Sequence, residues 1–85
     1  MWTENKVLVT LYVPLIEKKY EVFLPIGKKI EEIIYLLSKA IVDISNNEYQ
    51  LRGDEQLYNR LSGQEYKTGL LYSSGIRNGS QLVFI

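Results

Sequence analysis

The hydrophobic periodicity in the first half of this chain changes from two residues to about 3.6, and this change constrains the fold more than any other feature. Residues 7–13 (VLVTLYV) and 20–24 (YEVFL) alternate in polarity, as half-buried strands do, and a connection of hairpin length joins them. After Pro25 and Gly27, apolar residues recur at helical spacing over residues 28–44. The first half of the chain is therefore predicted to be a β-hairpin followed by one amphipathic helix. The predicted core face of that helix carries Ile30, Ile33, Ile34, Leu37, Ile41 and Ile44.

The second half of the chain predicts shorter elements. Residues 48–52 (EYQLR) and 57–61 are strand candidates, each followed by a glycine-containing turn. Residues 64–69 are expected to form a long turn, and residues 70–73 a single 3₁₀ turn. Residues 81–85 (QLVFI) are predicted to close the chain as a strand.

These elements predict an α+β fold in ββαββ order, with a sheet of four to five strands packed on one helix. Eighty-five residues with 46% hydrophobic content suffice for one domain, so residues 1–85 are predicted to be a single unit. Residues 1–5 are expected to be a flexible leader. No apolar stretch approaches the ~20 residues of a transmembrane helix, and no signal-peptide core is visible, so a cytoplasmic location is expected.

Composition argues against several functional classes. The chain contains no cysteine and no histidine, so the usual thiol nucleophile, general base and transition-metal ligands are missing. An enzyme, a metal and a cofactor are therefore not expected. Ten basic residues balance ten acidic ones, whereas nucleic-acid-binding proteins normally carry a basic excess. The expected partners are other proteins.

The last third of the chain resembles the ending of ubiquitin-like proteins, in which a leucine, a short turn, an apolar anchor, a polar turn and a final strand follow one another. Here those places fall to Leu71, Ile76 and the Asn78-Gly79 turn before residues 81–85. The Gly-Ile-x-Asn-Gly pattern and the Ser-Gly turn within residues 60–64 are most similar to the YukD/EsaB family, small ubiquitin-like proteins of firmicute type VII secretion systems. The resemblance implies a β-grasp fold with a mixed sheet. It also implies a non-catalytic accessory or regulatory role that works by docking to secretion-machine subunits.

The C-terminus bears on a different ubiquitin-like function. Ubiquitin and the β-grasp sulfur carriers act through a flexible tail that ends in Gly-Gly, whereas this sequence stops at Ile85, inside its predicted last strand. A conjugated role is therefore not expected. Two alternatives stay open: a sulfur carrier or modifier, if the native chain continues to Gly-Gly, and an interaction domain unrelated to secretion.

Strand alternation divides the predicted sheet into two faces. The core face is expected to carry Val7, Val9, Leu11, Val22, Leu24, Leu51, Leu82 and Phe84. Ubiquitin's recognition patch lies on the outer face and is centred on an apolar residue of the third strand; here that place is predicted to fall to Gln50 or Arg52. The candidate protein-binding residues of the outer face are Leu8, Tyr12, Phe23, Gln50, Arg52, Val83 and Ile85.

Tyr35 and Val42 are seven residues apart on the helix and are predicted to point away from the core, as a second docking stripe. For both surfaces the alternative is that these are ordinary solvent-facing residues, because isolated apolar side chains are common on protein surfaces.

Overall fold

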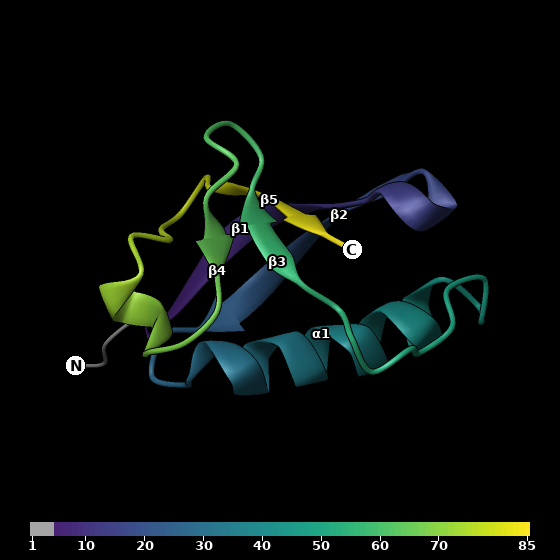
Figure 1. Ribbon diagram of the computed structural model, residues 1–85, viewed down its shortest axis with the longest axis horizontal. Coiled ribbons are helices and arrows are strands. Elements are labelled where there is room, and N and C mark those ends of the chain that lie inside the picture. Colours follow the sequence, from purple (N-terminus) through teal and green to yellow (C-terminus); the bar gives the residue numbers. More distant parts are fainter. Residues whose placement is uncertain (1–4) are drawn as a thin grey trace.

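Five strands form one mixed sheet, and a single α-helix packs across one of its faces (Figure 1). This computed structural model describes residues 5–85, so of the predicted flexible leader only Asn5 can be placed. The strand order across the sheet is β2-β1-β5-β3-β4. The α+β prediction is confirmed, with one strand more than the ββαββ order. The elements are β1 (Lys6–Val13), η1 (Pro14–Ile16), β2 (Lys18–Pro25), α1 (Ile30–Ile44), β3 (Leu57–Asn59), β4 (Glu65–Tyr66), η2 (Leu71–Ser73) and β5 (Gln81–Phe84).

The predicted hairpin is formed by β1 and β2, which pair antiparallel from Lys6 opposite Pro25 to Val13 opposite Lys18. The short 3₁₀ helix η1 reverses the chain and ends at Glu17, whose φ of 54° is left-handed. Val9, Leu11 and Val13 are buried, so the odd-numbered residues of β1 face the helix and the even-numbered ones face away.

The last strand, β5, runs parallel to β1 in the middle of the sheet, with Leu11 opposite Leu82. A side chain locks the entry to this strand: the Asn78 Oδ1 atom accepts a 2.7 Å hydrogen bond from the backbone N–H of Leu8. Gly79 follows with a φ of 88°, which residues with a Cβ rarely adopt. The Asn-Gly turn therefore sets the register of a long-range parallel pair.

The helix α1 begins at Ile30, two residues later than predicted, and the carboxylate of Glu32 accepts a 3.2 Å hydrogen bond from the Lys29 backbone N–H at its start. Among the predicted core residues, Ile34 is partly buried and packs against the core, while Ile30, Ile33, Leu37 and Ile41 are buried.

Two helix predictions are wrong. Ile44 is 51% exposed, because the core beneath the last helical turn is occupied by Tyr49 from the following segment. Val42, predicted to point outward, is partly buried and packs against the core, since it lies one turn after the buried Ser38.

The segment after the helix is not the strand predicted for residues 48–52. Tyr49 turns inward and is fully buried, with its ring centroid 6.0 Å from that of Phe84. Leu51, expected in the core, is 52% exposed. Local hydrogen bonds replace strand pairing here: the Tyr49 backbone N–H donates to Ser45 Oγ, and its hydroxyl donates to Glu55. The alternation in this segment was misleading because only Tyr49 enters the core.

The third and fourth strands are short and lie later in the sequence. The candidate over residues 57–61 is confirmed as β3, which ends at Asn59 and pairs antiparallel with β5. The stretch 64–69, predicted as a turn, contains β4, whose Tyr66 lies opposite Leu57 and is buried. A two-residue strand carries too few residues for a period to be visible, so the sequence alone did not reveal it.

The helix start and the segment around η2 are joined by backbone hydrogen bonds, from the Ile30 N–H to the Gly69 carbonyl and from the Leu71 N–H to the Lys28 carbonyl. The predicted 3₁₀ turn is confirmed as η2, and Leu71 is fully buried there. Within residues 5–85, no helix has the length and apolar character needed to cross a membrane.

Candidate protein-binding surface

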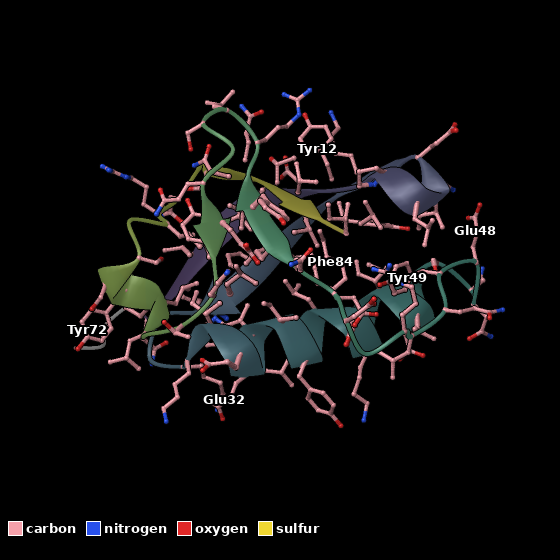
Figure 2. The ribbon with its side chains drawn as sticks, in the orientation of Figure 1. Tyr12, Glu32, Glu48, Tyr49, Tyr72 and Phe84 are labelled. Carbon is pink, nitrogen blue, oxygen red and sulfur yellow. The ribbon has the colours of Figure 1, made fainter. Side chains whose placement is uncertain are left out.

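The face of the sheet opposite α1 is open to solvent and carries four of the nine predicted binding residues, Leu8, Tyr12, Phe23 and Val83. Figure 2 shows Phe84 on the helix side of the sheet and Tyr12 on the opposite side, pointing away from α1. The division follows from strand alternation, because Phe84 is in register with the buried core residues and Tyr12 is an even-numbered residue of β1. We call this surface the outer sheet face.

One row of side chains crosses the outer sheet face over all five strands. In the strand register, Tyr12 lies opposite Val83 of β5 and Lys19 of β2, and Val83 lies opposite Tyr58 of β3. Tyr58 in turn lies opposite Glu65 of β4. Tyr12, Val83 and Tyr58 are each half-buried, so three apolar bodies are adjacent and only partly covered. We call these three residues the aromatic row.

Two cations flank the tyrosine at one end of this row. The guanidinium carbon of Arg60 lies 4.2 Å from the centroid of the Tyr12 ring, and Lys19 Nζ lies 5.9 Å from the same centroid. The Arg60 Nη1 group also donates a 3.2 Å hydrogen bond to Gln81 Oε1. Stacking on the ring and bonding to Gln81 together hold the guanidinium in one orientation.

Beside these cations the surface is hollowed. The hollow has a volume of about 400 Å³ and is lined by apolar surface of Pro14 and Val83 together with Tyr12 and the charged side chains of Glu17, Lys18, Lys19 and Arg60. Lys18 reaches Glu48 at 3.7 Å, so part of its charge is already balanced. Among residues 5–85, neither Lys19 nor Arg60 has a carboxylate within ion-pair distance.

A second apolar pair lies on the outer sheet face at the opposite end of the hairpin. Leu8 and Phe23 are cross-strand partners, Phe23 is 58% exposed, and Lys6 Nζ lies 5.1 Å from the Phe23 ring centroid. A polar row in which Thr10 is paired with both Glu21 and Gln81 separates this pair from the aromatic row. The candidates Leu8 and Val83 therefore do not form one patch.

The structure places the remaining outer-face candidates elsewhere. Gln50 and Arg52 lie in the connection between α1 and β3, outside the sheet, so neither takes the central position of the third strand. Ile85 is 40% exposed and follows β5, with its backbone N–H and carbonyl bonded to Gln56.

The helix stripe predicted from Tyr35 and Val42 is not formed as a pair. Tyr35 is 57% exposed and carries Lys39 Nζ 5.2 Å from its ring centroid, whereas Val42 is turned toward the core. An apolar groove lies instead between the helix and the edge strand β2, where Leu36 of α1 and Phe23 are among its lining residues.

Sequence reasoning missed two residues of the outer sheet face, Tyr58 and Arg60. Tyr58 takes the third-strand position that was assigned to Gln50 or Arg52, because the true third strand lies about eight residues later in the sequence. The sequence pattern that could have identified Tyr58 was the strand candidate over residues 57–61. Arg60 could not be found from the sequence, because its stacking on Tyr12 depends on β5 lying between β1 and β3.

Perturbed pKa values lie away from this surface, at Glu55 and its neighbours. Burial acts to raise the pKa of this carboxyl, but hydrogen bonds from the Arg52 N–H, the Tyr49 hydroxyl and the Gly53 N–H outweigh burial and hold the pKa below its usual value. Burial in turn raises the pKa of the Tyr49 hydroxyl, and its hydrogen bond to Glu55 adds to the effect. Every member of the cluster is satisfied within the connection from α1 to β3, so we assign it a structural role.

No three His, Cys, Asp or Glu residues in the described part of the chain are grouped so as to hold a metal ion. What the outer sheet face offers chemically is non-covalent: half-buried aromatic and aliphatic surface, an oriented guanidinium, and an ammonium group. Tyrosine and arginine side chains are enriched at protein–protein interfaces and among their energetic anchors.

The fold is that of ubiquitin-like domains. The chain is similar to the EccD5 ubiquitin-like domain from Mycobacterium xenopi, with 16% identity, 96% of this chain and 97% of that chain covered, and a TM-score of 0.71. It is also similar to the ubiquitin-like domain of the type VII secretion protein EccD1 from Mycobacterium tuberculosis, with 16% identity, 96% and 99% coverage, and a TM-score of 0.60.

A ubiquitin-like domain of an Arabidopsis thaliana protein is similar as well, with 23% identity, 100% of this chain and 81% of that chain covered, and a TM-score of 0.63. The sequence matches no protein-family model and no curated protein. At these sequence identities the likeness establishes the fold alone.

Proposed function

We propose that this chain is a non-catalytic, cytoplasmic, ubiquitin-like docking module of a type VII secretion apparatus, of the YukD/EsaB kind. Two lines support the proposal: the turn motifs around Asn78-Gly79 resemble that family, and solved ubiquitin-like domains of mycobacterial type VII secretion proteins are similar to the fold. Its partners are other proteins, including secretion-machine subunits at the membrane.

The observation that carries the docking role is the aromatic row. Its central residue, Val83, has aromatic neighbours on both adjacent strands, and all three side chains remain partly open to solvent. Among ubiquitin-like proteins, the corresponding third-strand position is the centre of ubiquitin's recognition patch. Here that position holds Tyr58 in place of the polar Gln50 or Arg52 predicted, so the centre of the surface is aromatic.

A second candidate role is an interaction domain unrelated to secretion. The similarity to a plant ubiquitin-like domain favours it, because the same fold serves outside secretion systems. A sulfur-carrier or modifier role depends on a Gly-Gly tail beyond Ile85, and the native C-terminal sequence decides it.

The test is affinity purification of the tagged protein from cytoplasm and membranes of its native cells, with mass spectrometry of what co-purifies. We expect subunits of a type VII secretion apparatus, lost with Tyr12→Ala and Val83→Asp and retained with the loop variant Arg52→Ala. Circular dichroism confirms that each variant is folded. Specific partners that include no secretion subunit would refute the pathway, and partners that tolerate both sheet variants would refute the surface.

A further inference from the structure

We infer that the outer sheet face recognises an acidic segment of a protein partner, with a partner carboxylate bound by Arg60 and an adjacent apolar side chain seated in the hollow beside Tyr12. This inference rests on the docking role proposed above and adds the chemistry of the partner. It is carried by the charge and geometry at one end of the aromatic row.

The guanidinium of Arg60 is held in place, and most of its hydrogen-bond donors are available. The Arg60 guanidinium carbon lies over the Tyr12 ring, 4.2 Å from its centroid, and one of the terminal nitrogens donates a hydrogen bond to Gln81. A guanidinium has five donors and this one uses a single side-chain acceptor, so most of its fork remains available. An arginine held in this way loses little conformational entropy when it binds a planar carboxylate through two hydrogen bonds.

The positive charges of Lys19 and Arg60 are not balanced by an ion pair within residues 5–85. Three ion pairs are formed among residues 5–85, and they involve Lys18, Arg52 and Lys67; Arg60 and Lys19 take part in none of them. These two free cations approach the same ring, so their fields add over the hollow. A carboxylate placed there gains two favourable interactions without displacing an internal partner.

The hollow beside these cations also has an apolar floor. Pro14 and Val83 line it next to the two cations, in a volume of about 400 Å³ that accommodates a branched aliphatic or aromatic side chain. A partner segment with an acidic residue beside an apolar one matches both halves of the site. Tyrosine and arginine at its centre are the residue types most often found as energetic anchors of interfaces.

The same features disfavour nucleic acid and anionic lipid. Glu17 lines the hollow, and Glu21 lies on the same face of the sheet, two residues after Lys19 in β2. A row of phosphates would therefore meet these carboxylates. The chain as a whole has a formal net charge of zero, so no overall positive charge offsets that repulsion. A short segment that turns one carboxylate toward Arg60 presents less negative charge to Glu17 and Glu21 than a row of phosphates does.

The test uses ¹⁵N-labelled protein and two synthetic, terminally blocked pentapeptides: Asp-Leu-Glu-Leu-Asp, and its uncharged counterpart Asn-Leu-Gln-Leu-Asn. We expect the acidic peptide to shift the backbone amide signals of Tyr12, Arg60, Gln81 and Val83, and the uncharged peptide to shift them at least tenfold less at equal concentration. Raising the salt concentration from about 50 to about 300 mM should weaken the acidic peptide further, because exposed charges are screened.

Variants separate the role of Arg60 from general charge. Arg60→Gln should weaken the acidic peptide about tenfold, the loss that corresponds to one charge-assisted hydrogen-bonded pair. Arg77→Gln is the matched control, because the substitution removes the same charge from an exposed arginine that lies in the turn before β5. Equal loss in both variants, equal shifts from the uncharged peptide, or shifts confined to other surfaces would overturn the inference.

Two further titrations address the excluded ligand classes, with oligouridylate and with phosphatidylglycerol vesicles. Tighter binding of either to the same residues than of the acidic peptide would also overturn the inference. The docking role is judged separately: if native partners are lost with Val83→Asp but bind Arg60→Gln as well as the unchanged protein, the surface stands and its acidic specificity falls.

Discussion

Replacing Glu55 with glutamine tests how the segment between α1 and β3 is held in place. The Glu55 carboxylate accepts hydrogen bonds from the Tyr49 hydroxyl at 2.7 Å, the Arg52 N–H at 2.9 Å and the Gly53 N–H at 3.1 Å. A glutamine amide can satisfy one or two of these donors but carries no charge. Each hydrogen bond to a charged group contributes about 1.5–3 kcal/mol, so we expect Glu55→Gln to cost about 2 kcal/mol of unfolding free energy.

For a domain of this size, a loss of about 2 kcal/mol lowers Tm by roughly 8–16 °C. Urea denaturation followed by circular dichroism measures the free energy directly. The control is Glu48→Gln, whose carboxylate makes one exposed contact with Lys18 at 3.7 Å and should change stability by less than about 0.5 kcal/mol.

The effect should also depend on pH, with a defined sign. The pKa of Glu55 is lowered on folding, so its stabilisation is complete above the unfolded-state pKa of about 4.3 and is lost as pH falls through the lower folded-state pKa. Glutamine does not titrate. The stability difference between the unchanged protein and Glu55→Gln should therefore shrink when the pH is lowered from about 7 to about 2.5. A difference that is constant or grows on acidification would refute the assignment of the charged carboxylate as the acceptor.

Three further predictions concern the core, the turn before β5 and the backbone there. Ile41→Ala should cost about 2–5 kcal/mol of unfolding free energy, whereas Ile44→Ala should cost less than about 1 kcal/mol because Ile44 is half-exposed; comparable losses would contradict the described helix face. Asn78→Ala removes the acceptor of the Leu8 N–H and should cost about 1 kcal/mol by urea denaturation, and a neutral result would show that water replaces the bond. Gly79→Ala should cost about 1–2 kcal/mol although no atom lies within 4 Å of the added Cβ, because φ is 88°; an unchanged Tm would contradict that backbone conformation.

The sequence by itself determined the elements with a clear hydrophobic period. The hairpin, the helix and the last strand each repeat a period over enough residues to be recognised, and the Asn78-Gly79 turn has its own chemical signature. The order of those elements predicted the α+β fold, and the resemblance of the last third of the chain to ubiquitin-like proteins implied the β-grasp arrangement. These features depend on local patterning and turn chemistry, which the sequence displays directly.

Only the tertiary structure decided the path of the segment between α1 and β3, the short strand β4 and the composition of the outer sheet face. Tyr49 is not part of a strand because its ring is buried in the core near Phe84 and its hydroxyl donates a hydrogen bond to Glu55. Neither contact is visible in the local sequence pattern. Tyr58 and Arg60 join Tyr12 because the parallel pairing of β5 with β1 places β3 on the other side of β5. Which side chains share a surface is set by strand order across the sheet, a long-range property that hydrophobic periodicity does not encode.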